Sequence, residues 1–303
     1  MEHWHCLSVT IPHEAHEAVD AVSNFLLELG STGIVEGDHD PAKPLPLTTT
    51  VLAYFPAEIS GPDVYAALEH YLSQLSSLFP SFNTQDQLSA QLSQVSSEAW
   101  HEQWRDHFPP IQVGFSFLIL PPWETRPART DRKVIVIDPS MAFGTGHHAT
   151  TQGCLEAIES LGVSYGPPQR ALDVGTGSGI LAIALARLGC SEVWAIDTDP
   201  IALDETRKNL ATNSITSGIH LSGETIESLP GPFPLLVANL FAKTLIDLAP
   251  MLVDAVASQG YAILSGIQVE QAAEVEAAFA APMWQAVSRL DREEWVILVY
   301  KRI

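Results

Sequence analysis

Three glycines and two acids near the middle of the chain could bind a cofactor that contains a nucleoside. Residues 173–179 read Asp-Val-Gly-Thr-Gly-Ser-Gly, follow the short strand-like run 170–172 and precede a helix-like segment, Ile180 to Leu188. Such a turn lets a cofactor approach the backbone closely. Asp197 follows the next apolar strand, where a carboxylate can bind two ribose hydroxyls. A glycine-rich turn with a purely structural role is the alternative.

The spacing of the glycines distinguishes between cofactors. Dinucleotide folds usually show G-x-G-x-x-G, which places a pyrophosphate at the helix N-terminus. Here the pattern is D-x-G-x-G-x-G, and its leading acid, Asp173, would repel a pyrophosphate but attract an ammonium group. S-adenosylmethionine carries an ammonium and no phosphate. It is therefore the predicted cofactor, with Gly175 and Asp197 as contacts and Asp173 and Gly177 as weaker candidates.

Two other segments are predicted to lie at the same end of the sheet. Residues 138–151 include a second glycine-rich turn, but the Gly-Lys-Ser/Thr ending of a triphosphate site is missing. His147 and His148 in this segment have no evident acidic partner, and no metal site is predicted. Asn239 ends a later strand, where its amide could meet the methionine part of the cofactor or the incoming nucleophile.

The elements that must position these residues fall into three regions. Residues 1–96 are predicted to form an α+β, ferredoxin-like domain, residues 97–110 a connecting helix or linker, and residues 111–303 the cofactor domain. The first region contains a core but no catalytic constellation, so its predicted role is recognition. Trp100 and Trp104 in the connector are predicted to pack against one of the domains rather than bind a ligand.

Strands and helices alternate in the cofactor domain, which predicts a doubly wound parallel sheet with ligands at the carboxyl ends of its strands. Asp199 and Pro200 are the expected N-cap and first residue of one helix. Two consecutive strands at the end suggest a closing antiparallel hairpin. The predicted strands are Ala171–Val174, Val193–Ile196, Ile219–Ser222, Leu235–Ala238, Tyr261–Ser265, Gln285–Leu290 and Trp295–Tyr300.

Composition limits the classes of partner. The net charge of -21, from 36 acids and 15 bases, opposes binding to nucleic acid. It would attract a basic protein, although it could serve solubility alone. No apolar run is long enough for a membrane span and no signal peptide is evident, which predicts a cytoplasmic protein. The three cysteines have no redox or metal spacing and are expected to be reduced.

Six motifs occur in order: FGTGHHATT, LDVGTGSGILAIALARLG, AIDTDPIAL, LLVANL, LSGI and EEWVIL. In these motifs the chain resembles the PrmA family, the bacterial methyltransferases of large-subunit ribosomal protein eleven. The resemblance implies a seven-stranded, Rossmann-like class I domain that uses S-adenosylmethionine, preceded by a domain that recognises the ribosomal protein. It also implies methylation of lysine side chains and of an N-terminal amine.

Position by position, the resemblance places cofactor contacts at Thr151, Gly175, Asp197 and Asn239, with Phe143 and Thr145 as weaker candidates. Asn239 is also the candidate for positioning the acceptor, and the general base is unassigned. The Asn239 segment lacks the Pro-Pro-Tyr that enzymes acting on planar nitrogens use, which favours an aliphatic amine. Another basic protein or a small amine as acceptor, and a noncatalytic cofactor-binding or ribosome-assembly module, are the alternatives.

Overall fold

The chain divides into two units, Met1–Phe108 and Pro109–Ile303. The structure is a computed structural model that describes residues 3–12, 17–31, 33–36, 48–78, 89–96, 108–139 and 144–303. The predicted connector, 97–110, lies mostly outside the described residues, as does its pair Trp100 and Trp104. The predicted domain boundaries therefore stay a prediction.

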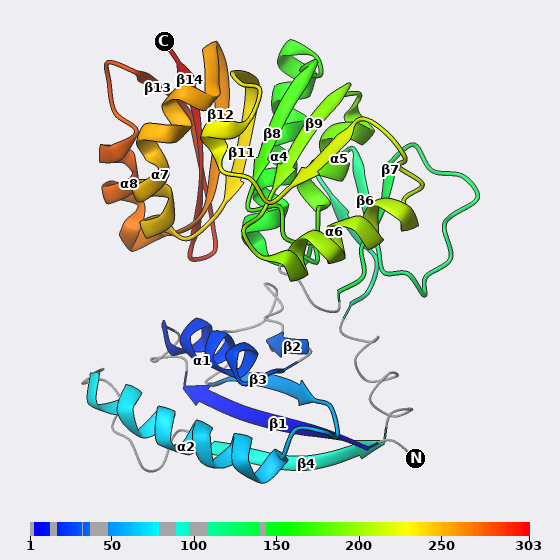
Figure 1. Cartoon of the computed structure of the whole chain (residues 1–303), viewed down its shortest axis with the longest axis vertical. Helices are drawn as coiled ribbons and strands as arrows, with labels where there is room; N and C mark the ends of the chain where they lie inside the picture. The colour runs from blue at the N-terminus through cyan, green and yellow to red at the C-terminus, as the bar shows by residue number, and fades with distance from the viewer. Residues whose placement is uncertain are drawn as a thin grey trace. The chain divides into compact units, whose positions relative to one another are not determined.

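The first unit is an antiparallel sheet in the order β2-β3-β1-β4 with two helices (Figure 1). Strand β1 places Leu7, Val9 and Ile11 on one face because side chains alternate along a strand, and these residues pack with Val22 and Leu26 of α1. Strand β4 was not predicted. The elements are β1 (His3–Pro12), α1 (Glu17–Glu28), β2 (Gly33–Glu36), β3 (Thr48–Phe55), α2 (Gly61–Leu78) and β4 (Ser89–Ser96).

The second unit contains a seven-stranded sheet in the order β10-β9-β8-β11-β12-β14-β13. Its first five strands are parallel, and β14 runs antiparallel to both neighbours. The predicted Rossmann-like sheet and its closing hairpin are confirmed. The strands are β8 (Arg170–Val174), β9 (Glu192–Ile196), β10 (Ile219–Ser222), β11 (Phe233–Asn239), β12 (Val256–Gln268), β13 (Trp284–Arg292) and β14 (Trp295–Arg302).

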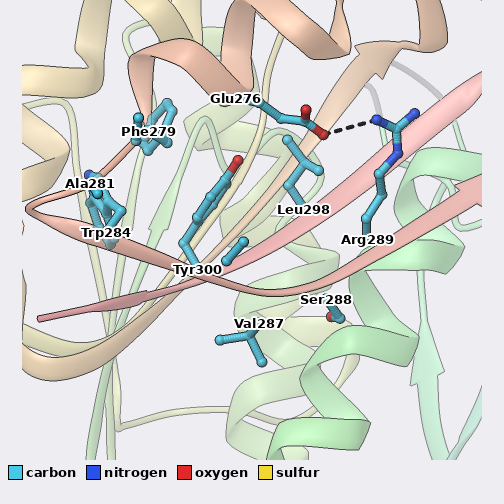
Figure 2. Close-up of a pocket in the computed structure, with 11 residues that line it drawn as sticks. Glu276, Phe279, Ala281, Trp284, Val287, Ser288, Arg289, Leu298 and Tyr300 are labelled. Carbon is cyan, nitrogen blue, oxygen red and sulfur yellow. Dashed lines mark hydrogen bonds and ion pairs between the residues drawn. The ribbon is translucent and has the colours of Figure 1, made fainter.

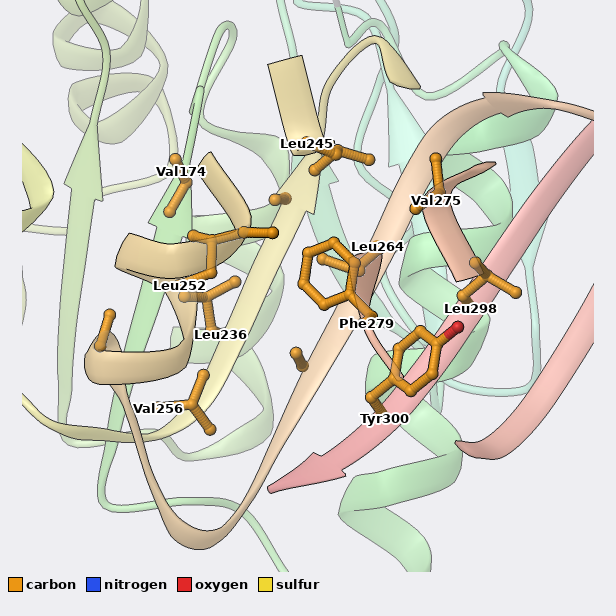
Figure 3. Packing of buried hydrophobic residues seen from close by; sticks show 14 of the residues in the cluster. Val174, Leu236, Leu245, Leu252, Val256, Leu264, Val275, Phe279, Leu298 and Tyr300 are labelled. Atoms are coloured by element: carbon orange, nitrogen blue, oxygen red, sulfur yellow. The ribbon is translucent and has the colours of Figure 1, made fainter. Parts of the chain in front are cut away.

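Helices cover both faces of this sheet (Figure 1). On one face, Leu236 of β11 packs with Leu245 and Leu252 of α7 (Figure 3). Alternate residues of β11, such as Val237, pack on the other face with α4 and α5. The helices are α4 (Ala149–Tyr165), α5 (Ile180–Leu188) and α6 (Pro200–Thr212) on one face, and α7 (Ala242–Ala255) and α8 (Ala272–Ala278) on the other.

A small separate sheet precedes the large one, with β6 between an antiparallel β5 and a parallel β7. Its strands are β5 (Ile111–Val113), β6 (Phe117–Leu120) and β7 (Lys133–Val136). Among the described helices, none is long and apolar enough to cross a membrane.

Candidate active site

The glycine-rich turn after β8 has a backbone that favours glycine. Gly175, Gly177 and Gly179 have φ angles of +72°, +54° and +84°, in the left-handed region that costs other residues roughly 1–2 kcal/mol. The turn is also tightly packed: a Cβ on Gly175 would lie 2.4 Å from Cδ2 of Leu240. The peptide N–H groups of Gly175 and Thr176 both donate to the carbonyl of Ile196, which ties the turn to β9.

Asp197 is bound to this turn. One carboxylate oxygen, Oδ2, accepts the N–H of Gly177 at 3.0 Å, and Oδ1 accepts the N–H of Asp199 at 3.0 Å. Asp199 is the N-cap of α6 and Pro200 its first residue, as predicted. These two bonds fix the orientation of the carboxylate, while each oxygen keeps acceptor capacity for another donor. The structure thus brings the predicted residues Gly177 and Asp197 together.

Asp173 is completely buried at the end of β8. Its Oδ2 accepts hydrogen bonds from Oγ1 of Thr176 at 2.7 Å and from the N–H of Ala182 at 3.1 Å. Its Oδ1 has no partner among the described residues. Burial raises the pKa of Asp173 to about 7; the two hydrogen bonds oppose this rise, and the nearby charge of Asp197 adds to it. A cation at Oδ1 would stabilise the ionised carboxylate.

Asn239 meets the first turn of α4 at the carboxyl edge of the sheet. Its Nδ2 donates to Oγ1 of Thr150 at 3.2 Å, and Oγ1 of Thr150 lies 2.7 Å from Nδ1 of His148. The next residue, Thr151, is completely buried. Neither Oδ1 of Asn239 nor Oγ1 of Thr151 has a hydrogen-bond partner in the part of the chain that is described, although both atoms are buried. Buried polar atoms of this kind need a partner, so a ligand is indicated here.

The two adjacent histidines have different structural contacts. His148 is the N-cap of α4, where its Nδ1 accepts the N–H of Thr150, and its ring lies edge-on to Trp295 with centroids 5.0 Å apart. Burial lowers the pKa of His148, and the charge of Glu294 opposes this change. Nε2 of His147 lies 3.0 Å from the carbonyl of Pro109. No group of three or more potential metal ligands occurs among the described residues.

Two polar residues of α6 and its C-cap residue, Asn213, support the site and were missed in the sequence. Oγ1 of Thr206 donates to the carbonyl of Gly177, Nδ2 of Asn209 donates to the carbonyl of Ser178, and Asn213 bonds both the N–H and the carbonyl of Val136. All three are buried. Their spacing of three and four residues places them on one helix face, which is the signal that could have identified them.

The second glycine-rich turn is joined to the first by Ser178. The hydroxyl of Ser178 donates to the carbonyl of Gly144 at 2.6 Å, next to the predicted residue Thr145. Oγ1 of Thr145 accepts the N–H of His147 at 3.4 Å. Phe143, a weaker candidate, lies outside the described residues. The two glycine-rich turns therefore lie side by side at the same edge of the sheet, although 34 residues separate Gly144 from Ser178.

A pocket of about 400 Å³ lies elsewhere, between α8 and the β13–β14 hairpin (Figure 2). Phe279, Trp284 and Tyr300 form its aromatic lining, and the ion pair of Glu276 and Arg289 lies at one end. None of the predicted site residues lines this pocket. It is therefore separate from the candidate active site.

Comparison with known proteins identifies the fold and the family. Residues 3–303 match the family model described as "Ribosomal protein L11 methyltransferase (PrmA)". The chain belongs to the PrmA family. The PrmA match covers both units, including the first, in which no catalytic constellation was predicted.

Individual relatives agree with this membership. A "Ribosomal protein L11 methyltransferase" of Pelobacter propionicus is 37% identical over 297 residues, 94% of this chain and 94% of that protein. The protein of the same name from Chloroflexus aurantiacus is 36% identical over 324 residues, 94% and 95% of the two chains. The crystal structure of "ribosomal protein L11 methylase" from Lactobacillus delbrueckii subsp. bulgaricus aligns with a TM-score of 0.58 at 35% identity, covering 64% of this chain and 98% of that chain. This PrmA family member is thus a methyltransferase with the class I fold.

Proposed function

We propose that this protein transfers methyl groups from S-adenosylmethionine to amines of ribosomal protein L11, both lysine side chains and the N-terminal amine. The observation that carries the proposal is the set of unpartnered buried oxygens of Thr151, Asp173 and Asn239. They lie where α4 begins and where β8 and β11 end, beside a glycine turn bound to Asp197. Family membership supports the choice of acceptor.

The site residues fit the polar groups of S-adenosylmethionine. The carboxylate of Asp197 would accept bonds from ribose hydroxyls, and Oδ1 of Asp173 would attract the ammonium group. Gly175 allows close approach to the backbone. Thr151 and Asn239 present further polar atoms for the methionine part. When bound, the cofactor supplies a methyl group on a positively charged sulfur, which is a good leaving group.

The protein's own task is to prepare the acceptor amine. A free lysine has a pKa near 10.4, so its ammonium must lose a proton before the nitrogen can attack. Exclusion of water from this edge when the acceptor and the cofactor are both bound would lower that pKa, because loss of water disfavours the charged form. Oδ1 of Asn239, which has no partner among the described residues, can accept an N–H of the amine and so orient its lone pair. No described residue is assigned as general base.

Charge and domain organisation support a basic protein as the partner. The chain carries a net charge of -21, which attracts a basic protein and disfavours a direct nucleic-acid substrate. The first unit would recognise the ribosomal protein while the second transfers the methyl group. A different basic protein or a small amine is the alternative acceptor.

The test uses the full-length chain, S-adenosylmethionine labelled in its methyl group and three acceptors: purified ribosomal protein L11, a second basic ribosomal protein and a small alkylamine. We expect label only in L11, at lysine and N-terminal nitrogens located by mass spectrometry. Equal labelling of the second protein or the small amine would favour the alternative. If calorimetry shows cofactor binding but nothing is labelled, methyl transfer by this protein is refuted.

A further inference from the structure

Phe241 is an exposed aromatic residue at the edge of the candidate site. It lies two residues after Asn239, and 62% of its surface is exposed. Within the described residues its ring stacks on no other aromatic ring. A single exposed aromatic side chain is common on protein surfaces, so the position of Phe241, and not its exposure alone, decides whether it has a role.

The backbone on both sides of Phe241 is fixed. The N–H of the preceding residue, Leu240, donates to the carbonyl of Ser265 at 3.0 Å. A Cβ on Gly266 of β12 would lie 2.4 Å from the carbonyl oxygen of Leu240, so the backbones of these two residues approach closely. On the other side, Ala242 is buried, and the carbonyl of Phe241 accepts the first helical bond of α7. The exposed ring is therefore held by a backbone that has little freedom.

Phe241 is distinct from the residue that packs against the cofactor turn. The side chain of Leu240 packs against Gly175 in the cofactor turn. Phe241, the next residue, is the N-cap of α7, with φ -55° and ψ 146°. Its exposed ring therefore extends from the carboxyl edge of the sheet, one residue beyond the side chain that contacts the cofactor turn and two residues beyond Asn239. That is the place where an acceptor would approach.

We propose that Phe241 is a specificity residue that contacts the alkyl chain and the cationic nitrogen of the acceptor lysine. This assignment rests on the proposed function. An aromatic face attracts an ammonium group and also packs against methylene groups. It does so whether the nitrogen carries hydrogens or methyl groups, because the attraction requires only the positive charge. Phe241 would thus hold a mono- or dimethylated ammonium at the edge until it loses a proton to water and its free lone pair can accept another methyl group.

The experiment compares full-length variants on ribosomal protein L11. For Phe241→Ala we expect kcat/KM for L11 to fall about 3- to 10-fold, with a larger share of mono- and dimethylated lysine among the products. Cofactor affinity should stay within about twofold, because the side chain that packs against the cofactor turn is that of Leu240 and not that of Phe241. Phe241→Tyr should retain activity, and Phe241→Leu should fall between, since it keeps apolar contact without an aromatic face.

Phe115→Ala is the matched control, because Phe115 is 90% exposed on a turn in the same unit and its N–H is bound to Glu159. It should match wild type in kcat/KM and product distribution. If wild type methylates L11 and Phe241→Ala does so equally well, the role of Phe241 is overturned and the proposed function stands. An equal loss in Phe115→Ala would also overturn it. A wild-type enzyme that transfers nothing to any protein overturns both proposals.

Discussion

Replacing Asp173 by asparagine should make the protein more stable and its cofactor binding weaker. The side chain is completely buried, and only its Oδ2 is hydrogen-bonded within the described residues. The amide oxygen of asparagine can accept the same bonds from Thr176 and Ala182, and its NH₂ group would occupy the position of Oδ1. The shape of the turn is thus retained while the buried negative charge is removed.

The expected size of the stability change follows from the pKa. Burial raises the pKa of Asp173 from its ordinary value of 3.8 to about 7. The folded state therefore binds a proton that the unfolded state has lost between these two values, and stability falls as pH rises through this window. The full loss, reached above about pH 7, is about 4 kcal/mol as an upper estimate. Asp173→Asn has no such loss, so its advantage should appear at pH 8 and vanish near pH 4.

Cofactor affinity should change in the opposite direction. If the ionised carboxylate attracts the ammonium of S-adenosylmethionine, Asp173→Asn should bind it about 10- to 100-fold more weakly at pH 8. The difference should shrink below pH 6, where wild-type Asp173 becomes protonated. Urea unfolding at pH 4, 6 and 8 and calorimetric titration at pH 6 and 8 measure the two effects. Unchanged affinity at pH 8, or a variant less stable than wild type at that pH, would refute the reasoning.

Substitutions at three further site residues, together with two control variants, test the rest of the site. Asp197→Ala should weaken S-adenosylmethionine binding more than tenfold in calorimetry through loss of the ribose contacts, and unchanged affinity would remove that assignment. Gly166→Ala should lose about 1–3 kcal/mol in urea unfolding, because its φ of +80° and ψ of 164° are a conformation that few residues other than glycine adopt. Gly175→Ala should lose at least as much, because its φ is also positive and a Cβ would in addition lie 2.4 Å from Cδ2 of Leu240. Only Gly175→Ala should also lose cofactor affinity, because a Cβ on Gly166 meets no atom within 4 Å; equal affinities would argue against a cofactor contact at Gly175. Thr150→Val should lower kcat for L11 about tenfold because it releases Asn239, Thr150→Ser should restore it, and a valine variant with normal kcat would contradict this role.

The parts of the fold that could be predicted are those that leave a pattern of apolar, capping or turn residues in the local sequence. Buried parallel strands such as β8 and β11 are short apolar runs, and the N-cap Asp199 with Pro200 marks the start of α6. Strand β4 was missed because its residues are mostly Ser and Gln, with only small or isolated apolar side chains. Its place in the sheet comes from pairing with β1, whose partner residues lie 79 to 93 positions earlier in the chain, and no local pattern reveals such a pairing.

The residues of the candidate site could be predicted from the sequence, whereas most of the hydrogen bonds between them could not. The spacing of Gly175, Gly177 and Asp197 indicated a cofactor turn, and the bond from the N–H of Gly177 to Asp197 is consistent with that prediction. The bond between Asn239 and Thr150 spans 89 residues, and it depends on how β11 and α4 meet. Thr206 was not identified because a polar residue on a helix usually lies at the surface, and its bond to the glycine turn depends on how α6 packs there.

The cofactor side and the acceptor side of this edge differ in how they are constrained. Buried polar bonds hold the cofactor side from several directions: Thr206 and Asn209 hold the glycine turn, and Ser178 joins it to the second turn. All of these bonds join groups of the protein itself, so they can hold the cofactor side before a cofactor binds, and binding then needs little further ordering. On the acceptor side, by contrast, the backbone of Phe241 is fixed while its ring is exposed. A fixed cofactor side beside the exposed ring of Phe241 is the arrangement expected if, as proposed, the enzyme holds one cofactor in one way and accepts amines that carry different numbers of methyl groups.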